Sequence, residues 1–348
     1  KNLGFEILCD DWRYFCLENP PQFLAGYPND GCAVVNVDTL EASIYDDMPE
    51  AKQYYKRLCR EYEAGVIDPE TFTMSYEEYL EKIASGCVLG MVDQGWQFVD
   101  AEYVLRENGM DERTYVPLGL TISEDVSGAY QSKPAINSGN GVGISVSCED
   151  VEGALQFLND LLAPEIEILR SWGEEGVDYQ VDEDGVFYRT EEQRSQASDA
   201  QWQLENRCSY SYFPHKEGML RDGINAAAPD QQPGEYYATL SETDREVLDA
   251  YGYEKWTDFL GEPKENTPWF PLYSAIESWG QDTPYGQAKE GMDRVKKEWL
   301  PQVIMAGEKQ FEQVWEQYQE AYRAEVDVEA YERELTEEVR RRVEAAEE

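Results

Sequence analysis

The stretch from Tyr54 to Trp96 restricts the possible folds of this chain more than any other part of the sequence. It predicts the later turns of one helix, then a second helix and a short buried strand. The first helix is expected over residues 49–65, because proline favours a first helical turn and glycine ends a helix. The apolar run at residues 88–92 predicts the strand. Alternation of helices and strands indicates an α/β architecture.

A capping box marks the start of the second helix. Ser75 lies just before it and Glu78 follows three residues later, so hydroxyl and carboxylate each accept a hydrogen bond from an otherwise unpaired backbone N–H. After the strand, Gly95 frees the backbone to turn and Trp96 follows at once. We therefore expect Trp96 to project beyond the strand, where no core awaits it. The alternative is that Trp96 covers the core beneath a helix at residues 99–108.

Local patterns predict further elements on both sides of this stretch. Asp184 and Gly185 form a hairpin signal, and the arginines at 340–342 are expected at a solvated helix end, where they favour the helix dipole. Further strands are expected at residues 32–37, 115–120 and 142–146. Further helices are expected at residues 149–162, 164–172, 244–251, 291–299, 301–305, 308–323 and 328–345.

The charge and the aromatic content limit the classes of partner. The chain has 348 residues and a net charge of −43, with 72 acidic against 29 basic residues. Such a field repels nucleic acid phosphate and anionic lipid, so neither partner is expected. Nine Trp and 24 Tyr residues are unusually many. They either fill the core, where aromatics bury large areas, or line a groove in which ring faces stack on sugars.

Catalytic and metal-binding motifs have little support in this sequence. The seven cysteines form no C-x-x-C motif, and His215 is the single histidine, so we expect no metal site and no cofactor. The spacing of Asp178, Asp182 and Asp184 differs from that of a calcium loop. No nucleophile elbow is present, and no carboxylate pair stands out among so many. We therefore assign no catalytic residue.

Three stretches, in the same order along the chain, carry a family resemblance. They are residues 54–96, residues 143–185 and residues 299–331, the last with a glycine-bearing helix start before Phe311 and Trp315. Together they resemble the extracellular solute-binding proteins of ABC transporters (family 1), in the lipoprotein and alginate-oligosaccharide-binding branch. The resemblance implies an α/β fold of the type II periplasmic-binding-protein class, with two lobes, an interlobe cleft and a helix-rich C-terminus.

The same resemblance implies a function and a set of contacts. It predicts capture of an oligosaccharide or another small solute for the membrane permease of an ABC importer, by a lipoprotein at the extracellular surface. The binding residues that it implies are aromatic, with one amide, in the segments that approach the family's cleft. They are Trp96, Trp172, Tyr179, Trp202, Tyr210, Tyr212 and Asn140.

The resemblance also implies how the chain is divided. We expect a second-lobe α/β segment over 1–125, a crossover with a first-lobe segment over 126–215, and a mainly helical segment over 216–348. No signal peptide, lipobox or membrane-spanning run is seen. The opening strands of the family's first lobe are missing as well. We therefore expect a truncated first lobe with uncovered apolar residues.

Two other classes of function remain open at this point. One is a polysaccharide-active glycoside hydrolase or lyase, which turnover abolished by one carboxylate-to-amide change would identify. The other is a surface adhesion or scaffold protein, which would present a flat surface without an aromatic cleft. We expect binding without catalysis.

Overall fold

The computed structural model describes residues 2–133, 141–206 and 213–347, and the chain divides into two compact units. Unit 1 comprises Lys1–Lys133 and Thr257–Glu348, and unit 2 comprises Pro134–Trp256. The sequence predicted boundaries after residues 125 and 215. In the structure the chain passes from unit 1 to unit 2 after residue 133 and returns to unit 1 after residue 256.

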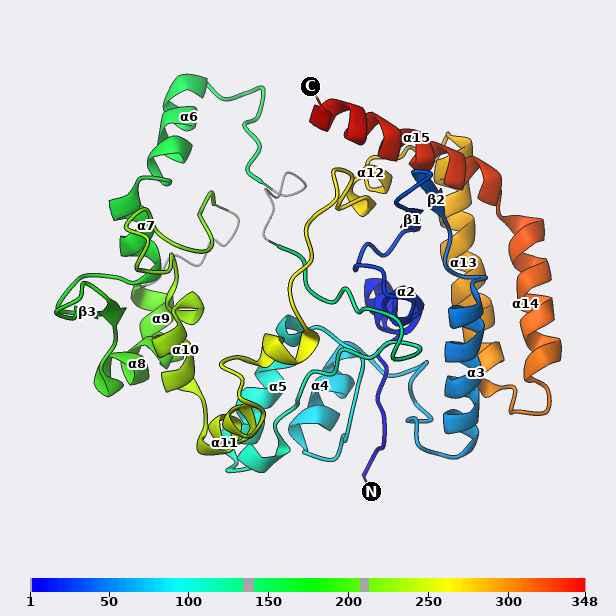
Figure 1. Cartoon of the computed structure of the whole chain (residues 1–348), viewed down its shortest axis with the longest axis horizontal. Coiled ribbons are helices and arrows are strands. Elements are labelled where there is room, and N and C mark those ends of the chain that lie inside the picture. The colour runs from blue at the N-terminus through cyan, green and yellow to red at the C-terminus, as the bar shows by residue number, and fades with distance from the viewer. Residues whose placement is uncertain (1, 134–140, 207–212, 348) are drawn as a thin grey trace. The chain divides into compact units, whose positions relative to one another are not determined.

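Unit 1 is built mainly from helices (Figure 1). In chain order its elements are η1 (Asp11–Tyr14), α1 (Phe15–Glu18), α2 (Pro20–Leu24), β1 (Val34–Asn36), β2 (Glu41–Ser43), α3 (Pro49–Glu63), α4 (Tyr76–Ala84), α5 (Gly95–Glu107), η2 (Asp111–Arg113), α12 (Tyr273–Ile276), α13 (Pro284–Met305), α14 (Phe311–Glu325) and α15 (Val328–Glu347). A further short helix, η4 (Trp256–Leu260), begins at the last residue of unit 2.

Unit 2 is also mainly helical, with one two-stranded hairpin. In chain order its elements are α6 (Val151–Asp160), α7 (Pro164–Ser171), β3 (Gln180–Val181), β4 (Phe187–Tyr188), α8 (Glu191–Ser198), α9 (Ala200–Asn206), η3 (Pro229–Gln231), α10 (Pro233–Thr239) and α11 (Glu242–Tyr251). The hairpin confirms the turn predicted at Asp184 and Gly185.

Local helix signals were read correctly in several places. The capping box at α4 is present, with Glu78 N–H donating to Ser75 Oγ at 3.2 Å and Ser75 N–H donating to Glu78 Oε2 at 2.8 Å. Helix α3 begins at Pro49 as predicted. Pro301, however, lies inside α13 and does not separate two helices. A proline there removes one backbone hydrogen bond, and burial of Leu300, Val303 and Ile304 on the same helix offsets that loss.

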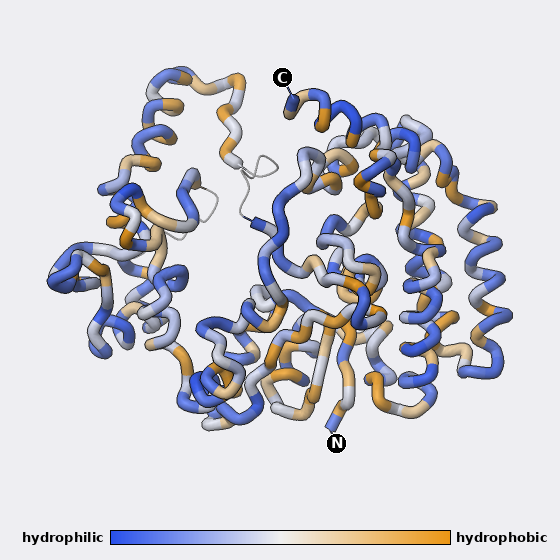
Figure 2. Tube along the Cα trace, in the orientation of Figure 1, coloured by the Kyte–Doolittle hydropathy of each residue, from blue (hydrophilic) through white to orange (hydrophobic). Residues whose placement is uncertain are grey.

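The N-terminal segment forms the centre of a minimal parallel ladder. Residues 3–6 lie between residues 66–68 and 87–91, through backbone bonds such as Phe5 N–H to Val66 O at 2.9 Å and Glu6 N–H to Gly90 O at 2.9 Å. Helices α3 and α4 connect these segments along the chain. Figure 2 shows hydrophobic residues concentrated along this part of the trace. The strand predicted at 88–92 is therefore present only as isolated bridges.

Two other predicted strands are wrong. Residues 115–120 and 142–146, all of which the structure describes, are irregular. Leu118 and Leu120 are exposed. A strand needs a neighbouring segment to pair its backbone groups, and neither run has one. The apolar face predicted for residues 149–162 also stays open, because every residue of α6 is at least partly exposed.

Helix α13 is the central helix of the unit 1 core. It packs against α3, α14 and α15, which lie around it in Figure 1. Aromatic residues fill much of the space between them: Trp315 contacts Phe311, Tyr55 and Tyr318 with ring centroids 5.4–6.0 Å apart. A large share of the aromatic content is therefore core packing.

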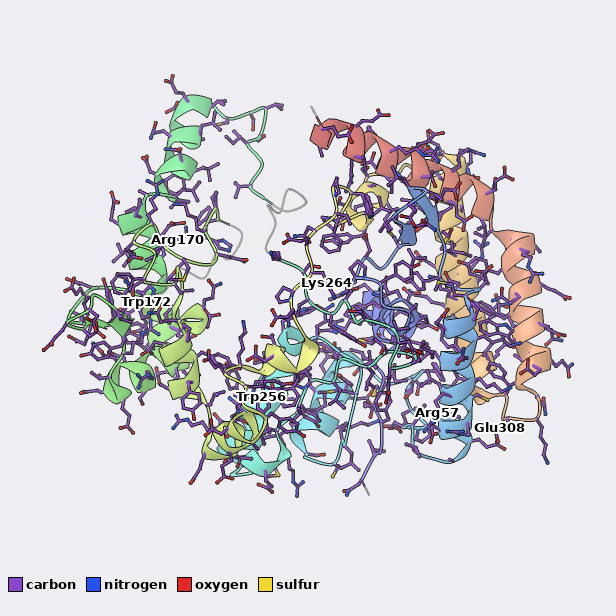
Figure 3. All side chains as sticks on the ribbon, in the orientation of Figure 1. Arg57, Arg170, Trp172, Trp256, Lys264 and Glu308 are labelled. Carbon is purple, nitrogen blue, oxygen red and sulfur yellow. The ribbon has the colours of Figure 1, made fainter. Side chains whose placement is uncertain are left out.

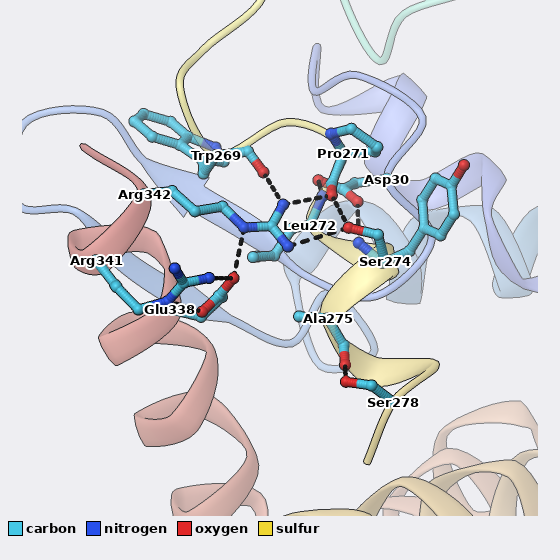
Figure 4. Close-up of polar contacts among 11 residues, drawn as sticks. Asp30, Trp269, Pro271, Leu272, Ser274, Ala275, Ser278, Glu338, Arg341 and Arg342 are labelled. Atoms are coloured by element: carbon cyan, nitrogen blue, oxygen red, sulfur yellow. Dashed lines mark hydrogen bonds and ion pairs between the residues drawn. The ribbon is translucent and has the colours of Figure 1, made fainter. Parts of the chain in front are cut away.

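Arg342 fixes helix α15 to the loop that precedes α12 (Figure 4). Its Nη1 donates to the carbonyl oxygens of Trp269 at 2.8 Å and Pro271 at 2.7 Å, and its Nη2 donates to Ser274 Oγ at 3.0 Å. Asp30 accepts the backbone N–H groups of Leu272 and Tyr273 in the same loop. The prediction of a solvated side chain is wrong for this arginine, because these acceptors hold its guanidinium group and leave the side chain only 19% exposed.

A buried ion cluster joins four separate parts of unit 1. Lys296 on α13 is 5% exposed at its side chain, and its Nζ lies 3.1 Å from Glu18 Oε2 and 3.4 Å from Asp46 Oδ1. Asp46 Oδ2 also accepts the Tyr322 hydroxyl at 3.2 Å. A buried charge is tolerated when it is paired and hydrogen-bonded in this way.

We predict that Lys296→Met lowers the free energy of unfolding by about 3–5 kcal/mol, because it leaves the Asp46 carboxylate buried without its cation. Urea denaturation measures the loss. Lys297→Met is the matched control at the next position, which is exposed, and it should cost less than about 1 kcal/mol. Equal losses in the two variants would contradict a structural role for the cluster.

Candidate aromatic binding site

Two exposed tryptophans stack on one another at the surface of unit 1. Trp12 and Trp96 are 54% and 58% exposed. Their ring centroids are 5.9 Å apart and the ring planes differ by 7°. Together the two rings form an exposed apolar patch at one place on the surface, and such patches are candidates for binding sites. We call Trp12 and Trp96 the indole pair.

The parallel ladder explains why the two indoles meet. Residues 3–6 and 87–91 run in the same direction, so both chains leave the ladder at the same edge. Trp12 lies on η1 shortly after the first segment, and Trp96 lies in the first turn of α5 shortly after the second. In open α/β folds, ligands bind beyond the carboxyl ends of the strands. The indole pair occupies such a position.

Backbone strain accompanies the turn into η1. Asp11, directly before Trp12, has a φ of 49°, a left-handed conformation that non-glycine residues rarely adopt. Such strain costs on the order of 1–3 kcal/mol and persists where the surroundings fix it, often at ligand-binding positions. The Asp11 turn is therefore a second unusual feature at the same edge.

Polar groups border the indole pair. The Arg13 guanidinium carbon lies 4.6 Å from the centre of the Trp12 ring and 3.9 Å from that of Tyr76. Trp96 Nε1–H donates to Gln94 Oε1 at 2.7 Å. Flat apolar faces beside amide and guanidinium groups suit a ligand with an apolar face and a hydroxylated rim, as a pyranose has.

Asp93 lies behind the pair, at the end of the second ladder segment. Its Oδ2 accepts the Tyr79 hydroxyl at 2.7 Å, and its Oδ1 accepts the Gln94 N–H at 2.7 Å and the Gln97 side-chain amide. Burial raises the pKa of Asp93, and these hydrogen bonds oppose that shift. The Cys16 thiol lies 3.5 Å from Oδ1, and burial raises its pKa too.

The sequence-based assignment of binding residues needs correction in unit 2. Trp172 is fully buried, and its Nε1–H donates to the Ala226 carbonyl at 3.0 Å. Figure 3 shows it in the interior of that unit. Tyr179 is also buried, and both rings pack against Phe187. These two residues form core, because the β3–β4 hairpin folds over them and leaves no face for a ligand.

The other assigned residues have different outcomes. Trp96 lies outside the core as predicted, and the alternative of a buried Trp96 is wrong. Trp202 is half-buried on α9. Asn140, Tyr210 and Tyr212 lie outside the described residues. Trp12 was not among the residues assigned from the sequence, where core packing is the likelier role of an early tryptophan, although like Trp96 it follows an apolar run and an acidic residue.

Unit 2 carries a surface pocket of about 730 Å³, and its two arginines are already engaged. Arg194 forms a two-point ion pair with Glu235, at 2.9 and 3.0 Å. Arg245 donates to the carbonyl oxygens of Tyr237 and Ala238. Both arginines therefore bind residues of helix α10, and the pocket between them is accounted for by these structural contacts.

No group of three or more His, Cys, Asp or Glu side chains suited to a metal ion occurs within the described parts of the chain. Over the same residues, no helix is both long enough and apolar enough to cross a membrane.

Burial also isolates Glu6, in the middle of the ladder. Its carboxyl group is fully buried, and its one side-chain partner is the neighbouring Asp68 carboxylate, to which a protonated Glu6 can donate. Burial, reinforced by the nearby Asp68 carboxylate, raises the pKa of Glu6 from 4.5 to about 8, and Lys82 only partly opposes this. Lys82 Nζ contacts Asp68 at 2.6 Å. The raised pKa favours the neutral form of Glu6.

We predict that this raised pKa makes unit 1 less stable as pH rises from about 4.5 to about 8. The folded state holds the Glu6 proton more tightly than the unfolded state, so its contribution is complete below the unfolded pKa and is lost as pH rises through the folded pKa. Glu6→Gln should remove this slope, which is at most about 1.4 kcal/mol per pH unit.

Urea unfolding at pH values across that interval tests the point. Glu70→Gln is the matched control, since Glu70 is exposed and contacts the same Lys82. The stability difference between Glu6→Gln and the unaltered chain should grow with pH, and that of the control should not. Parallel curves for all three proteins would mean that Glu6 is ionised in the folded state.

Comparisons with known proteins find likeness at the level of the fold. No protein-family model matches the sequence, and no curated protein does. Three solved structures resemble it over nearly the whole chain. The first is the Streptococcus pneumoniae ABC-transporter substrate-binding protein FusA, an EF-hand mutant in complex with fructo-nystose, with 13% sequence identity and a TM-score of 0.55 over 100% of this chain. The second is the alginate-binding protein AlgQ2 without calcium ion, with 12% identity and a TM-score of 0.54 over 99% of this chain. The third is an HMO-binding solute-binding protein associated with an ABC transporter of Bifidobacterium longum infantis, with 12% identity and a TM-score of 0.51 over 97% of this chain.

This chain spans 64% of the length of each of these proteins. The likeness confirms the fold expected from the sequence, that of ABC-transporter solute-binding proteins. At 12–13% identity it shows the fold alone.

Proposed function

We propose that this protein captures an oligosaccharide for an ABC importer and that the indole pair of unit 1 contacts the sugar. The observation that carries the proposal is the exposed, stacked Trp12 and Trp96 at the carboxyl edge of the ladder. Support comes from the fold, since the three similar structures are binding proteins whose descriptions name sugars or alginate. Capture needs no catalytic group, and the proposal assigns none.

The energetics of such a site are adequate. A micromolar dissociation constant corresponds to about 8 kcal/mol of binding free energy. Stacking on an aromatic ring contributes about 1–3 kcal/mol per base in nucleic acid complexes, and we take sugars to be comparable. The two rings stack on one another and Arg13 lies over Trp12, so the ring surface left open to a ligand supplies part of the total and hydrogen bonds to the polar border supply more.

The cellular setting follows from the same proposal. A capture protein works at the extracellular surface and hands its ligand to a membrane permease, so we place this protein there as a lipid-anchored partner of an ABC permease. Co-purification with a permease tests the partnership, and mass analysis of the protein from its native membrane tests the anchor.

We predict that Trp96→Ala weakens oligosaccharide binding by about 1–3 kcal/mol, with less than about 1 kcal/mol lost from the free energy of unfolding. Truncating a buried tryptophan would instead cost about 3–5 kcal/mol of stability, and Trp96 is 58% exposed. Isothermal titration with nystose, alginate oligosaccharides and milk oligosaccharides identifies a ligand and measures its affinity. Urea denaturation measures the stability.

Tyr103→Ala is the matched control, because Tyr103 is an equally exposed aromatic residue on the same helix, α5. It should leave affinity unchanged. A Trp96→Ala protein that binds its sugar as tightly as the control would contradict the assigned site. Failure of the unaltered protein to bind any oligosaccharide would contradict the function.

A further inference from the structure

We propose that Asp93 is a positioning residue that fixes the two indoles relative to one another and thereby sets the affinity of the site. This inference rests on the proposed function for its effect on sugar binding. Its structural part, the coupling of Asp93 to the geometry of the indole pair, is independent of any ligand. Asp93 itself is assigned no contact with the sugar.

The contacts of Asp93 connect the elements that carry both tryptophans. Gln97, one residue after Trp96 on α5, donates its side-chain amide to Asp93 Oδ1. Cys16 on α1, which directly follows the η1 helix of Trp12, places its thiol 3.5 Å from the same oxygen. The Gln97 amide also lies 3.6 Å from the Cys16 sulfur. One carboxylate therefore joins the supports of both rings.

Helix α4 provides the fixed reference for this junction. Tyr79 on α4 is fully buried and donates its hydroxyl to Asp93 Oδ2 at 2.7 Å. Tyr76, one turn earlier, donates its hydroxyl to the Gln97 carbonyl, and its backbone N–H donates to Asp10 Oδ2 at 3.1 Å. The same helix thus holds α5 on one side and the turn before Trp12 on the other.

The chemistry of the site requires a carboxylate at this position. Four donors converge on the two oxygens of Asp93: a phenol, a backbone N–H, an amide and a thiol. A carboxylate accepts at both oxygens, whereas an asparagine amide accepts at one and must donate at the other. Asp93→Asn therefore keeps a single acceptor oxygen and loses the negative charge. Either the Tyr79 hydroxyl must turn to accept the new NH2 group, with Met91 Sδ at 3.3 Å as its remaining acceptor, or the donors at Oδ1 lose theirs, and in both cases the junction is weakened.

We expect Asp93→Asn to change the environment of both indoles. In ¹⁵N–¹H spectra of the full chain, the Trp12 and Trp96 indole signals, assigned by their loss in Trp12→Phe and Trp96→Phe, should shift or broaden. Affinity for the oligosaccharide that the unaltered protein binds should fall about tenfold or more. Gln97→Met should act in the same direction, because it removes the α5 donor and keeps a side chain of similar size.

Asp100→Asn is the matched control, since Asp100 is an exposed aspartate on α5. Its indole signals and affinity should equal those of the unaltered protein. Should Asp93→Asn fail to fold, Gln97→Met carries the test. Unchanged Trp12 and Trp96 signals in a folded Asp93→Asn or Gln97→Met protein would overturn the inference. If no oligosaccharide binds the unaltered protein, the proposed function fails, and the indole signals still decide the role of Asp93.

Discussion

The backbone pairing of residues 3–6 with two distant segments is the interaction on which unit 1 depends. Leu3 and Glu6 donate to the 87–90 segment, and Phe5 donates to Val66 between them. The backbone N–H groups of Phe5 and Glu6 point to opposite sides of the extended chain, so this short segment pairs with two others. Those two segments precede and follow helix α4 in the sequence. Because all three run parallel, their carboxyl ends share one edge. The position of the indole pair is a consequence of that geometry.

The same ladder explains why a carboxylic acid lies unpaired in the core. Glu6 belongs to the central segment, so its side chain is enclosed from both sides. Lys82, the nearby cation, is held by Asp68 at 2.6 Å and by Glu70 at 2.7 Å. A lone buried carboxylate is more costly than a neutral acid. Burial therefore raises the pKa of Glu6, whereas in the Lys296 cluster the cation lies directly against the Glu18 and Asp46 carboxylates.

Local sequence signals predicted individual helices and turns better than they predicted how these elements pack together. The Ser75–Glu78 capping box, the Pro49 helix start and the 184–185 hairpin depend on neighbouring residues, and all three were read correctly. Trp172 was misassigned because its burial depends on a hairpin that packs from elsewhere in the chain. The contact between the two indoles could not be predicted for the same reason. Trp96 follows from its own stretch, whereas its stacking on Trp12 requires the pairing of segments about 80 residues apart in sequence.

The charge of the chain bears on which sugars suit the indole pair. A net charge of −43 creates a long-range field that repels anions before contact. The cation at the site, Arg13, already lies against the Trp12 and Tyr76 rings, and Asp10, Asp11 and Asp93 surround it in sequence or in space. A uronate polymer such as alginate would need local positive charge that this edge does not offer. A neutral oligosaccharide is not repelled by this field, and stacking on an aromatic face does not require a charged ligand. For the proposed sugar site, this charge distribution is the argument for an uncharged ligand over an acidic one, although one of the similar folds belongs to an alginate-binding protein.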